Sequence, residues 1–199
     1  MVNGRRERKD AQRNLERVLQ AAHELFAERG SAVTMEEVAR RAGVGVGTIY
    51  RRFPSKEHLW AAVSHAACMD AQQCLYQATA QQHDPVSKLR ALIVVQYCRS
   101  EEQAALLDMR LEKASDSCAS RSDQQQLYAA LHAMLQEVIV DGQRRGTIRA
   151  GDPAVLATLC LELLNPRAFL RLRQVVGGSA EDCAEHVVQF IVAALSAHN

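Results

Sequence analysis

One stretch constrains the fold of this 199-residue chain more than any other: TMEEVARRAGVGVGTIYRRFPSK, residues 34–56. Thr34 and Glu37 have the spacing of a capping box, which predicts that a helix begins after Thr34. Apolar side chains then recur at helical spacing as far as Ala42. Gly43 follows, and glycine readily ends a helix in the left-handed conformation. A second helix is predicted from about Gly45 to Phe53, because the proline after it cannot continue a helix.

The second helix has the composition of a helix that enters the major groove of DNA. Ile49 and Phe53 are four residues apart and are expected to face inward. Small residues at its start let the backbone approach base edges, and arginines can pair with guanine edges or phosphates. A merely solvated basic face is the alternative, because exposed arginines are common. We predict that the DNA-binding residues of this helix are Val46, Gly47, Thr48, Tyr50, Arg51 and Arg52. The sequence does not show which arginine reads bases.

Residues 1–13 are predicted to form a basic arm ahead of a first helix at about residues 10–29. Residues 1–60 contain 12 of the 24 basic side chains of the chain but only 8 of its 23 acidic ones. This N-terminal part is therefore the basic part of the chain, and it is the part that would meet phosphates. The arm is either a disordered tail or a segment that lies along phosphates or in the minor groove. The second interpretation assigns DNA contacts to Arg5 and Arg6.

Residues 13–63 resemble the N-terminal domain of TetR-family transcriptional regulators. The resemblance rests on the segments AAHELFAERG, VTMEEVARRAGV and GTIYRRFPSKEHL. It implies an all-α fold, with an N-terminal three-helix helix-turn-helix DNA-binding domain and a C-terminal helical ligand-binding and dimerisation domain. We expect residues 1–58 and 59–199 to be these domains, with the motif at about residues 34–53. Thr34 and Lys56 complete the predicted DNA-binding set.

The resemblance also implies a function. It suggests a ligand-responsive regulator, most often a repressor, that binds a palindromic operator as a homodimer and is released by a small molecule. A sequence-nonspecific architectural DNA-binding protein is the alternative, although the excess of acidic residues after residue 60 argues against it. An enzyme is not expected, because the sequence contains no G-x-S-x-G, phosphate-loop or HExxH motif.

The rest of the chain is predicted to be helical. Helices are expected at about residues 56–82, 86–99, 100–114, 124–145, 153–176 and 180–195. Ser100 is expected to cap one of them, and residues 115–122 are expected to form a loop. Pro166 is expected to interrupt or kink another helix. The segment after Pro153 is apolar nearly all round and must be covered on more than one side. The closing helices therefore predict a dimer interface, with packing inside one chain as the alternative.

The middle helices are expected to enclose a pocket for a hydrophobic or aromatic effector. Methionine and tyrosine suit a broad apolar site with a few polar groups. Each candidate has ordinary core packing as its alternative role. The predicted ligand-binding residues are Met69, Tyr76, Tyr97, Met109, Tyr128, Met134 and Phe169.

Other chemistry has weaker support in the sequence. His65 and Cys68 are three residues apart, with Cys74 and His83 further on, but a metal sensor usually has a tighter ligand cluster, so no metal or cofactor is expected. Redox sensing needs an activated thiolate, and nothing in the sequence marks one. With no apolar leader and no CxxC pair, the sequence predicts reduced cysteines and a cytoplasmic protein.

Overall fold

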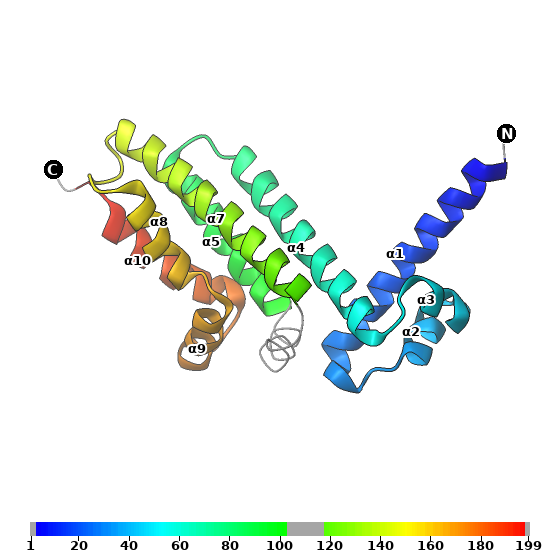
Figure 1. Ribbon diagram of the computed structural model, residues 1–199. Helices are drawn as coiled ribbons and strands as arrows, with labels where there is room; N and C mark the ends of the chain where they lie inside the picture. Colours follow the sequence, from blue (N-terminus) through cyan, green and yellow to red (C-terminus); the bar gives the residue numbers. More distant parts are fainter. Residues whose placement is uncertain (1–2, 103–117, 198–199) are drawn as a thin grey trace. The chain divides into compact units, whose positions relative to one another are not determined.

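The protein is described by a computed structural model covering residues 3–102 and 118–197. Its regular elements in those residues are helices, apart from one isolated bridge between Ile148 and Ser196, so the predicted all-α class is confirmed (Figure 1). The chain divides into two compact units. The first contains the described residues up to Ala67 and the beginning of α7 as far as Asp123, and the second contains the others.

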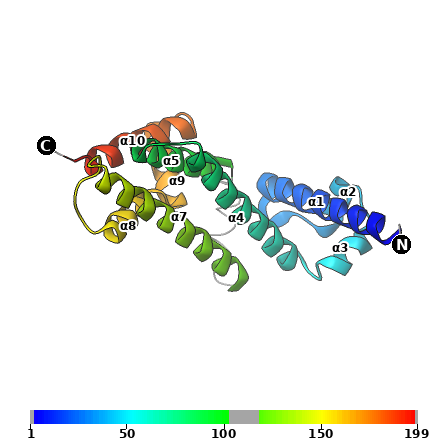
Figure 2. The same ribbon diagram turned by 90° about the horizontal axis from the view of Figure 1, so that it is seen from above.

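The first unit is a helix-turn-helix built on one long helix. It contains α1 (Asn3–Arg29), a 3-10 turn η1 (Gly30–Ala32), α2 (Met35–Ala42), α3 (Val46–Arg52) and the first part of α4 (Lys56–Ala80). Figure 2 shows α2 and α3 beside α1. Phe26 of α1 and Trp60 of α4 meet edge to face, with ring centroids 5.1 Å apart. The other fully buried core side chains include Val38, Ile49 and Leu59, which fix α2 and α3 against α1 and α4.

The second unit is a bundle with its own apolar core. It contains the rest of α4, α5 (Pro85–Glu102), α7 (Cys118–Arg144) from Gln124 onward, α8 (Pro153–Leu163), α9 (Pro166–Val176) and α10 (Ala180–Leu195). Polar side chains begin two of its helices. Asp84 accepts from the N–H of Ser87, and Asp152 accepts from the N–H of Ala154. Each carboxylate satisfies a backbone donor that the helix itself leaves unpaired.

The structure corrects three expectations about helix ends. The predicted arm is helical, because α1 begins at Asn3 and no proline interrupts the chain before Arg29. Ser100 is not a cap: it is buried inside α5, and its hydroxyl donates to the carbonyl of Gln96. A serine in a helix can satisfy its hydroxyl in this way, so it need not start a new helix. The predicted loop at residues 115–122 is also wrong for its second half, because α7 begins at Cys118.

Within residues 3–102 and 118–197, the apolar segment after Pro153 has one covered side and one exposed side. Leu156, Ala157 and Cys160 are buried, but Val155 and Leu159 remain more than half exposed. Pro166 separates α8 from α9, which are bent by 53°. In the described part of the chain no single helix is long and apolar enough to cross a bilayer; only the bent pair α8 and α9 together reaches that length and composition.

Candidate DNA-binding site

The two ends of α2 are set by local interactions that the sequence predicts. The hydroxyl of Thr34 accepts from the N–H of Glu37 at 3.2 Å, and the carboxylate of Glu37 accepts from the N–H of Thr34 at 3.0 Å. Gly43 ends α2 in the left-handed conformation, with φ +65°. A Cβ there would collide with the guanidinium of Arg17, which lies over the turn. The capping box and Gly43 are therefore confirmed, and they set where α2 begins and ends.

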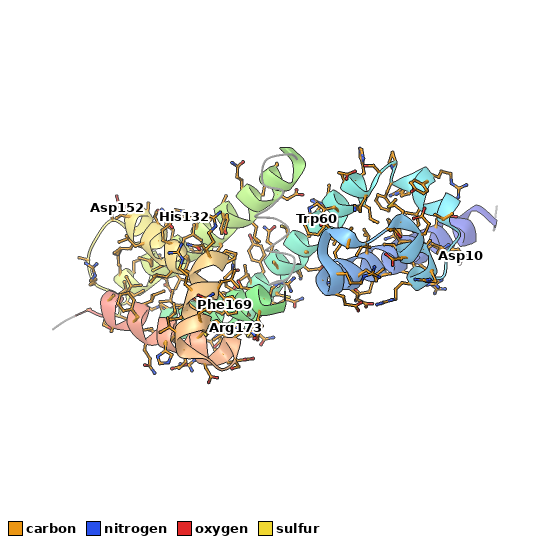
Figure 3. All side chains as sticks on the ribbon, turned by 90° about the horizontal axis from the view of Figure 1, so that it is seen from below. Asp10, Trp60, His132, Asp152, Phe169 and Arg173 are labelled. Atoms are coloured by element: carbon orange, nitrogen blue, oxygen red, sulfur yellow. The ribbon has the colours of Figure 1, made fainter. Side chains whose placement is uncertain are left out.

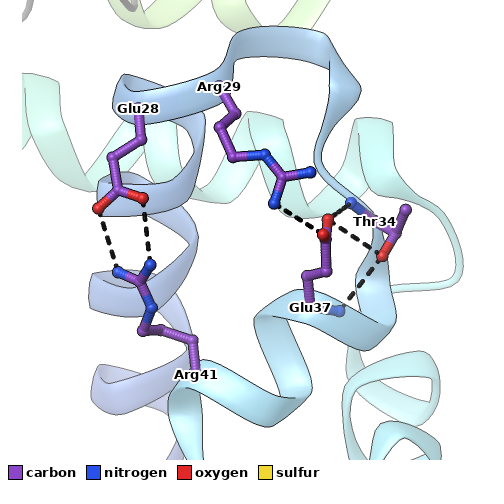
Figure 4. A network of polar contacts seen from close by, with 5 residues as sticks. All are labelled: Glu28, Arg29, Thr34, Glu37 and Arg41. Atoms are coloured by element: carbon purple, nitrogen blue, oxygen red, sulfur yellow. Dashed lines mark hydrogen bonds and ion pairs between the residues drawn. The ribbon is translucent and has the colours of Figure 1, made fainter.

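Ion pairs tie α2 to the end of α1 (Figure 4). Arg41 binds Glu28 through both terminal nitrogens, at 3.1 and 3.2 Å, and Arg29 binds Glu37 at 2.7 Å. The hydrogen bond from Arg41 lowers the pKa of Glu28. Hydrogen bonds from the Thr34 N–H and then from Arg29 lower the pKa of Glu37. Both carboxylates therefore stay charged at neutral pH and hold α2 at a fixed angle to α1.

The outer face of α3 carries the predicted DNA-binding residues. Ile49 is 1% exposed and Phe53 is 8% exposed, so they form the inner side as expected. Every other residue of α3 is exposed. Apart from its chain neighbours and the backbone of α3, no heavy atom of the described residues lies within 4 Å of the position that a Cβ on Gly47 would occupy, which leaves the backbone open to a close approach.

Helix geometry separates the two arginines that the sequence leaves undecided. Each residue turns an α-helix by about 100°. Arg51 follows the buried Ile49 by two residues and therefore faces about 200° away, directly outward beside Gly47. Arg52 follows by three residues and lies only about 60° from Ile49, on the flank of α3. This placement favours Arg51 as the reader of base edges.

The two flanks of α3 have different neighbours. On one flank the hydroxyl of Tyr50 lies 3.5 Å from the carboxylate of Glu36 on α2, a long and weak hydrogen bond. On the other flank an open groove of about 790 Å³ runs between α3 and α1. It is lined by Asp10, Ala11, Gln12, Asn14, Leu15 and Val18 of α1 and by Thr48, Ile49, Arg51, Arg52 and Phe53. Sequence reasoning missed Glu36 and the groove, because both depend on how separate helices pack.

The remaining predicted DNA-contacting residues either have structural partners or lie outside the described side chains. The ammonium of Lys56 donates to the carbonyl of Ser31 at 2.7 Å, so this side chain also fastens α4 to the turn after α1. Thr34 is exposed, but its hydroxyl is already used in the capping box. Arg5 and Arg6 lie on the first turns of α1, and their side chains are outside the described residues.

The predicted effector residues divide into two groups in the second unit. Tyr97, Met134 and Phe169 are buried in one core (Phe169 is labelled in Figure 3). Tyr97 donates to the carbonyl of Leu163 at 2.8 Å and meets Phe169 edge to face at 5.5 Å. Burial, and less strongly Cys183, raises the pKa of Tyr97 to about 12, so the hydroxyl stays a donor.

The other group lies near the surface. Met69 and Tyr76 are seven residues apart on α4 and about half exposed, so they share one exposed face. Tyr128 on α7 is partly exposed, and Met109 lies outside the described residues. The structure brings Tyr97, Met134 and Phe169 together in the core, and it places Met69 and Tyr76 outside that core.

The thiols and imidazoles of the described residues give no sign of a metal centre. No three His, Cys, Asp or Glu side chains gather there at ligand distance. His65 instead binds Asp123 at 2.9 Å. Burial raises the pKa of the Cys160 thiol to about 11 and also raises that of Cys183. Both thiols therefore remain protonated at neutral pH.

Comparison with known proteins agrees with this geometry. A family model described as "Bacterial regulatory proteins, tetR family" matches residues 18–63. A TetR transcription regulatory protein from Mycobacterium vanbaalenii is 30% identical, with 95% of this chain and 98% of that chain covered and a TM-score of 0.61. The chain belongs to the TetR family. It carries the helix-turn-helix domain of this family, as the resemblance implies.

Two further comparisons cover different shares of the chain. An HTH-type transcriptional regulator of Staphylococcus aureus (strain USA300) is 43% identical over 53 residues, 26% of this chain and 29% of that protein. The match thus spans under a third of that relative. A transcriptional regulator from Saccharomonospora viridis, crystallised with choline, is 20% identical, covers 92% of this chain and 98% of its own, and has a TM-score of 0.81. That likeness concerns the fold alone.

Proposed function

We propose that this TetR-family protein is a ligand-responsive repressor that binds a palindromic operator as a homodimer. The observation that carries the proposal is the outer face of α3. This helix presents an open glycine backbone, an outward arginine and Tyr50 while Ile49 is buried beneath it. A rigid helix with these groups can enter the major groove, and Arg51 can pair with a guanine edge there. Residues 1–58 are the DNA-binding domain of this proposal.

The helical start of α1 contains two further arginines of the predicted DNA-binding set. Arg5 and Arg6 lie on turns that continue α1 beyond the helix-turn-helix. We assign them phosphate contacts, made from a helix in place of an extended arm. Such contacts position a protein on DNA without reading sequence. Thr34 and Lys56 are assigned the same kind of contact, although both also have structural partners.

The dimer is supported by an apolar surface that one chain leaves open. Val155 and Leu159 lie one turn apart on α8, and Phe190 on α10 is 64% exposed. Exposed apolar clusters of this kind are typical of protein interfaces. A second copy packed on the closing helices would bury them. Two-fold symmetry then matches two copies of α3 to the two half-sites of a palindrome.

Release by a small molecule is assigned to residues 59–199. The choline complex of the Saccharomonospora viridis regulator shows that a protein of this fold was crystallised with a small molecule. We propose a hydrophobic or aromatic effector that contacts aromatic and sulfur side chains of the second unit. An effector with higher affinity for the conformer that fits DNA poorly lowers DNA affinity, and DNA lowers effector affinity by the same factor.

A DNA-binding measurement tests this function. Purified protein is titrated against labelled DNA flanking its own gene, at two salt concentrations, with and without random-sequence competitor. The proposal expects a discrete, competitor-resistant complex with two protomers or a multiple of two. Weak complexes on every duplex, lost at moderate salt, would show phosphate electrostatics alone and would support an architectural protein instead.

A further inference from the structure

We infer that the groove between α1 and α3 is a binding site for one sugar–phosphate strand of DNA. In this site Arg52 and Thr48 of α3 and Asn14 of α1 hold the strand from opposite sides. The inference rests on the proposed function and deepens it, because it assigns sequence-independent contacts to the flank of α3 and to a residue of α1.

The width of DNA places a strand at this position. An α-helix with its side chains is about 10–12 Å across, and the major groove is about 12 Å wide. A helix lying in that groove therefore has a sugar–phosphate edge against each flank. Tyr50 occupies the flank of α3 that faces α2. The other flank borders the groove, so the second strand must pass along it.

The groove has the chemistry of a backbone site. Asn14, Thr48 and Arg52 lie along it and carry amide, hydroxyl and guanidinium donors, the groups that commonly bind phosphate oxygens. Leu15 and Ile49 also line it and supply apolar surface for the carbon face of a deoxyribose. Arg51 also lines the groove, so two guanidinium groups attract phosphate oxygens there.

One acidic residue orients the strand within the groove. Asp10 lines the same groove one helical turn before Asn14 (Asp10 is labelled in Figure 3). Its carboxylate repels phosphate at that end. The phosphate is therefore expected beside Asn14 and Arg52, and Asp10 keeps the next phosphate of the strand outside.

Alanine variants with matched controls test the site. Arg52→Ala and Asn14→Ala are compared with Gln20→Ala, which removes an amide from α1 outside the groove. Arg171→Ala, an exposed arginine on α9, controls for the loss of one positive charge. The probes are a duplex selected from a random pool by the wild-type protein and an unselected random duplex, each titrated at several salt concentrations.

The site predicts a specific pattern of losses. Arg52→Ala should weaken binding about tenfold on both duplexes and reduce the salt slope by about one, as for a phosphate contact. Asn14→Ala should weaken both by about threefold without changing the slope, because a neutral donor releases no counterion. The double variant should lose less DNA affinity than the product of the two single fold-losses, because Arg52 and Asn14 contact the same phosphate. Both control variants should bind like the wild type.

Two results would overturn the inference. One is an Asn14→Ala protein that binds like Gln20→Ala. The other is an Arg52→Ala protein that loses affinity only for the selected duplex, which would make Arg52 a base reader. A wild-type protein that selects no duplex at all would contradict the proposed function itself, which is a separate outcome.

Discussion

At the scale of single residues, a substitution at Gly47 is expected to change the stability of α3 and its DNA affinity in opposite directions. Gly47 lies inside a helix with open space where a Cβ would be. Alanine is favoured over glycine in helices by about 1 kcal/mol. Gly47→Ala should therefore raise the melting temperature, yet it should weaken operator binding about tenfold, because the methyl group keeps the backbone from base edges. Thermal melts and DNA titrations on the same sample measure both effects.

Gly142 is the matched control for this substitution. It also lies inside a helix, α7, but a Cβ there would overlap the side chain of Ile148. Overpacking of this kind typically costs about 1–3 kcal/mol. Gly142→Ala should lower the melting temperature and leave DNA affinity of the folded protein unchanged. If Gly47→Ala behaved like Gly142→Ala, Gly47 would be a packing residue and its place in the DNA site would be wrong.

Glu36 is expected to restrain DNA binding through Tyr50. Its carboxylate competes with a DNA phosphate for the Tyr50 hydroxyl and repels that phosphate. Glu36→Gln should raise DNA affinity several-fold at low salt, a gain of roughly 1 kcal/mol. Glu137→Gln removes the same charge from an exposed site on α7 and is the control.

A double-mutant cycle separates the two effects of Glu36. In a Tyr50→Phe background the gain from Glu36→Gln should shrink, because the hydroxyl is no longer there to be released. An equal gain in both backgrounds would leave charge repulsion as its whole cause.

At the scale of helices, the contact between α1 and α2 predicts a loss of stability in acid. A carboxyl whose pKa is lower in the folded than in the unfolded chain stabilises the fold above its unfolded pKa, and this contribution disappears as pH falls through the folded pKa. Glu28 and Glu37 are such groups. The melting temperature of the first unit should therefore fall as pH is lowered from about 5 to 3.

Trp60 is the one tryptophan of the chain and is buried in the first unit, so its fluorescence follows that unit. Glu37→Gln should be less stable at neutral pH and should lose less stability on acidification. Parallel pH curves for the variant and the wild type would show that Glu37 does not link α1 to α2 in solution.

At the scale of the whole molecule, we expect the exposed side chains of α8 and α10 to mediate the association of two copies. Leu159→Glu and Phe190→Glu place a charge on this surface, and an unpaired charge in an interface is strongly unfavourable. Each variant should shift the protein toward the 22.0 kDa monomer in light scattering and lose affinity for a palindromic duplex.

Val86→Glu changes an exposed apolar residue of α5 and should leave the dimer intact. A dimer that survives both substitutions on α8 and α10 would place the interface elsewhere.

Local signals in the sequence predicted much of this architecture because they act between neighbouring residues. Thr34, Glu37 and Gly43 lie within ten residues of one another, and their hydrogen bonds form as predicted. The Asp152–Pro153 start of α8 is equally local and is confirmed. The prediction that Ser100 caps a helix was wrong because serine occurs both at helix caps and inside helices. Only the continuation of α5 past it distinguishes the two.

The sequence by itself determined the helical class, the helix-turn-helix and the inward side of α3, because capping and periodicity depend on short-range geometry. The tertiary structure decided what lies beside each functional residue. The bond from Lys56 to Ser31 spans 25 residues, and the groove joins residues of α1 to α3 more than 30 positions away. Which flank of α3 meets α1, and which side of α8 stays uncovered, depend on how separate helices pack, and such long-range contacts leave no periodic trace in the sequence.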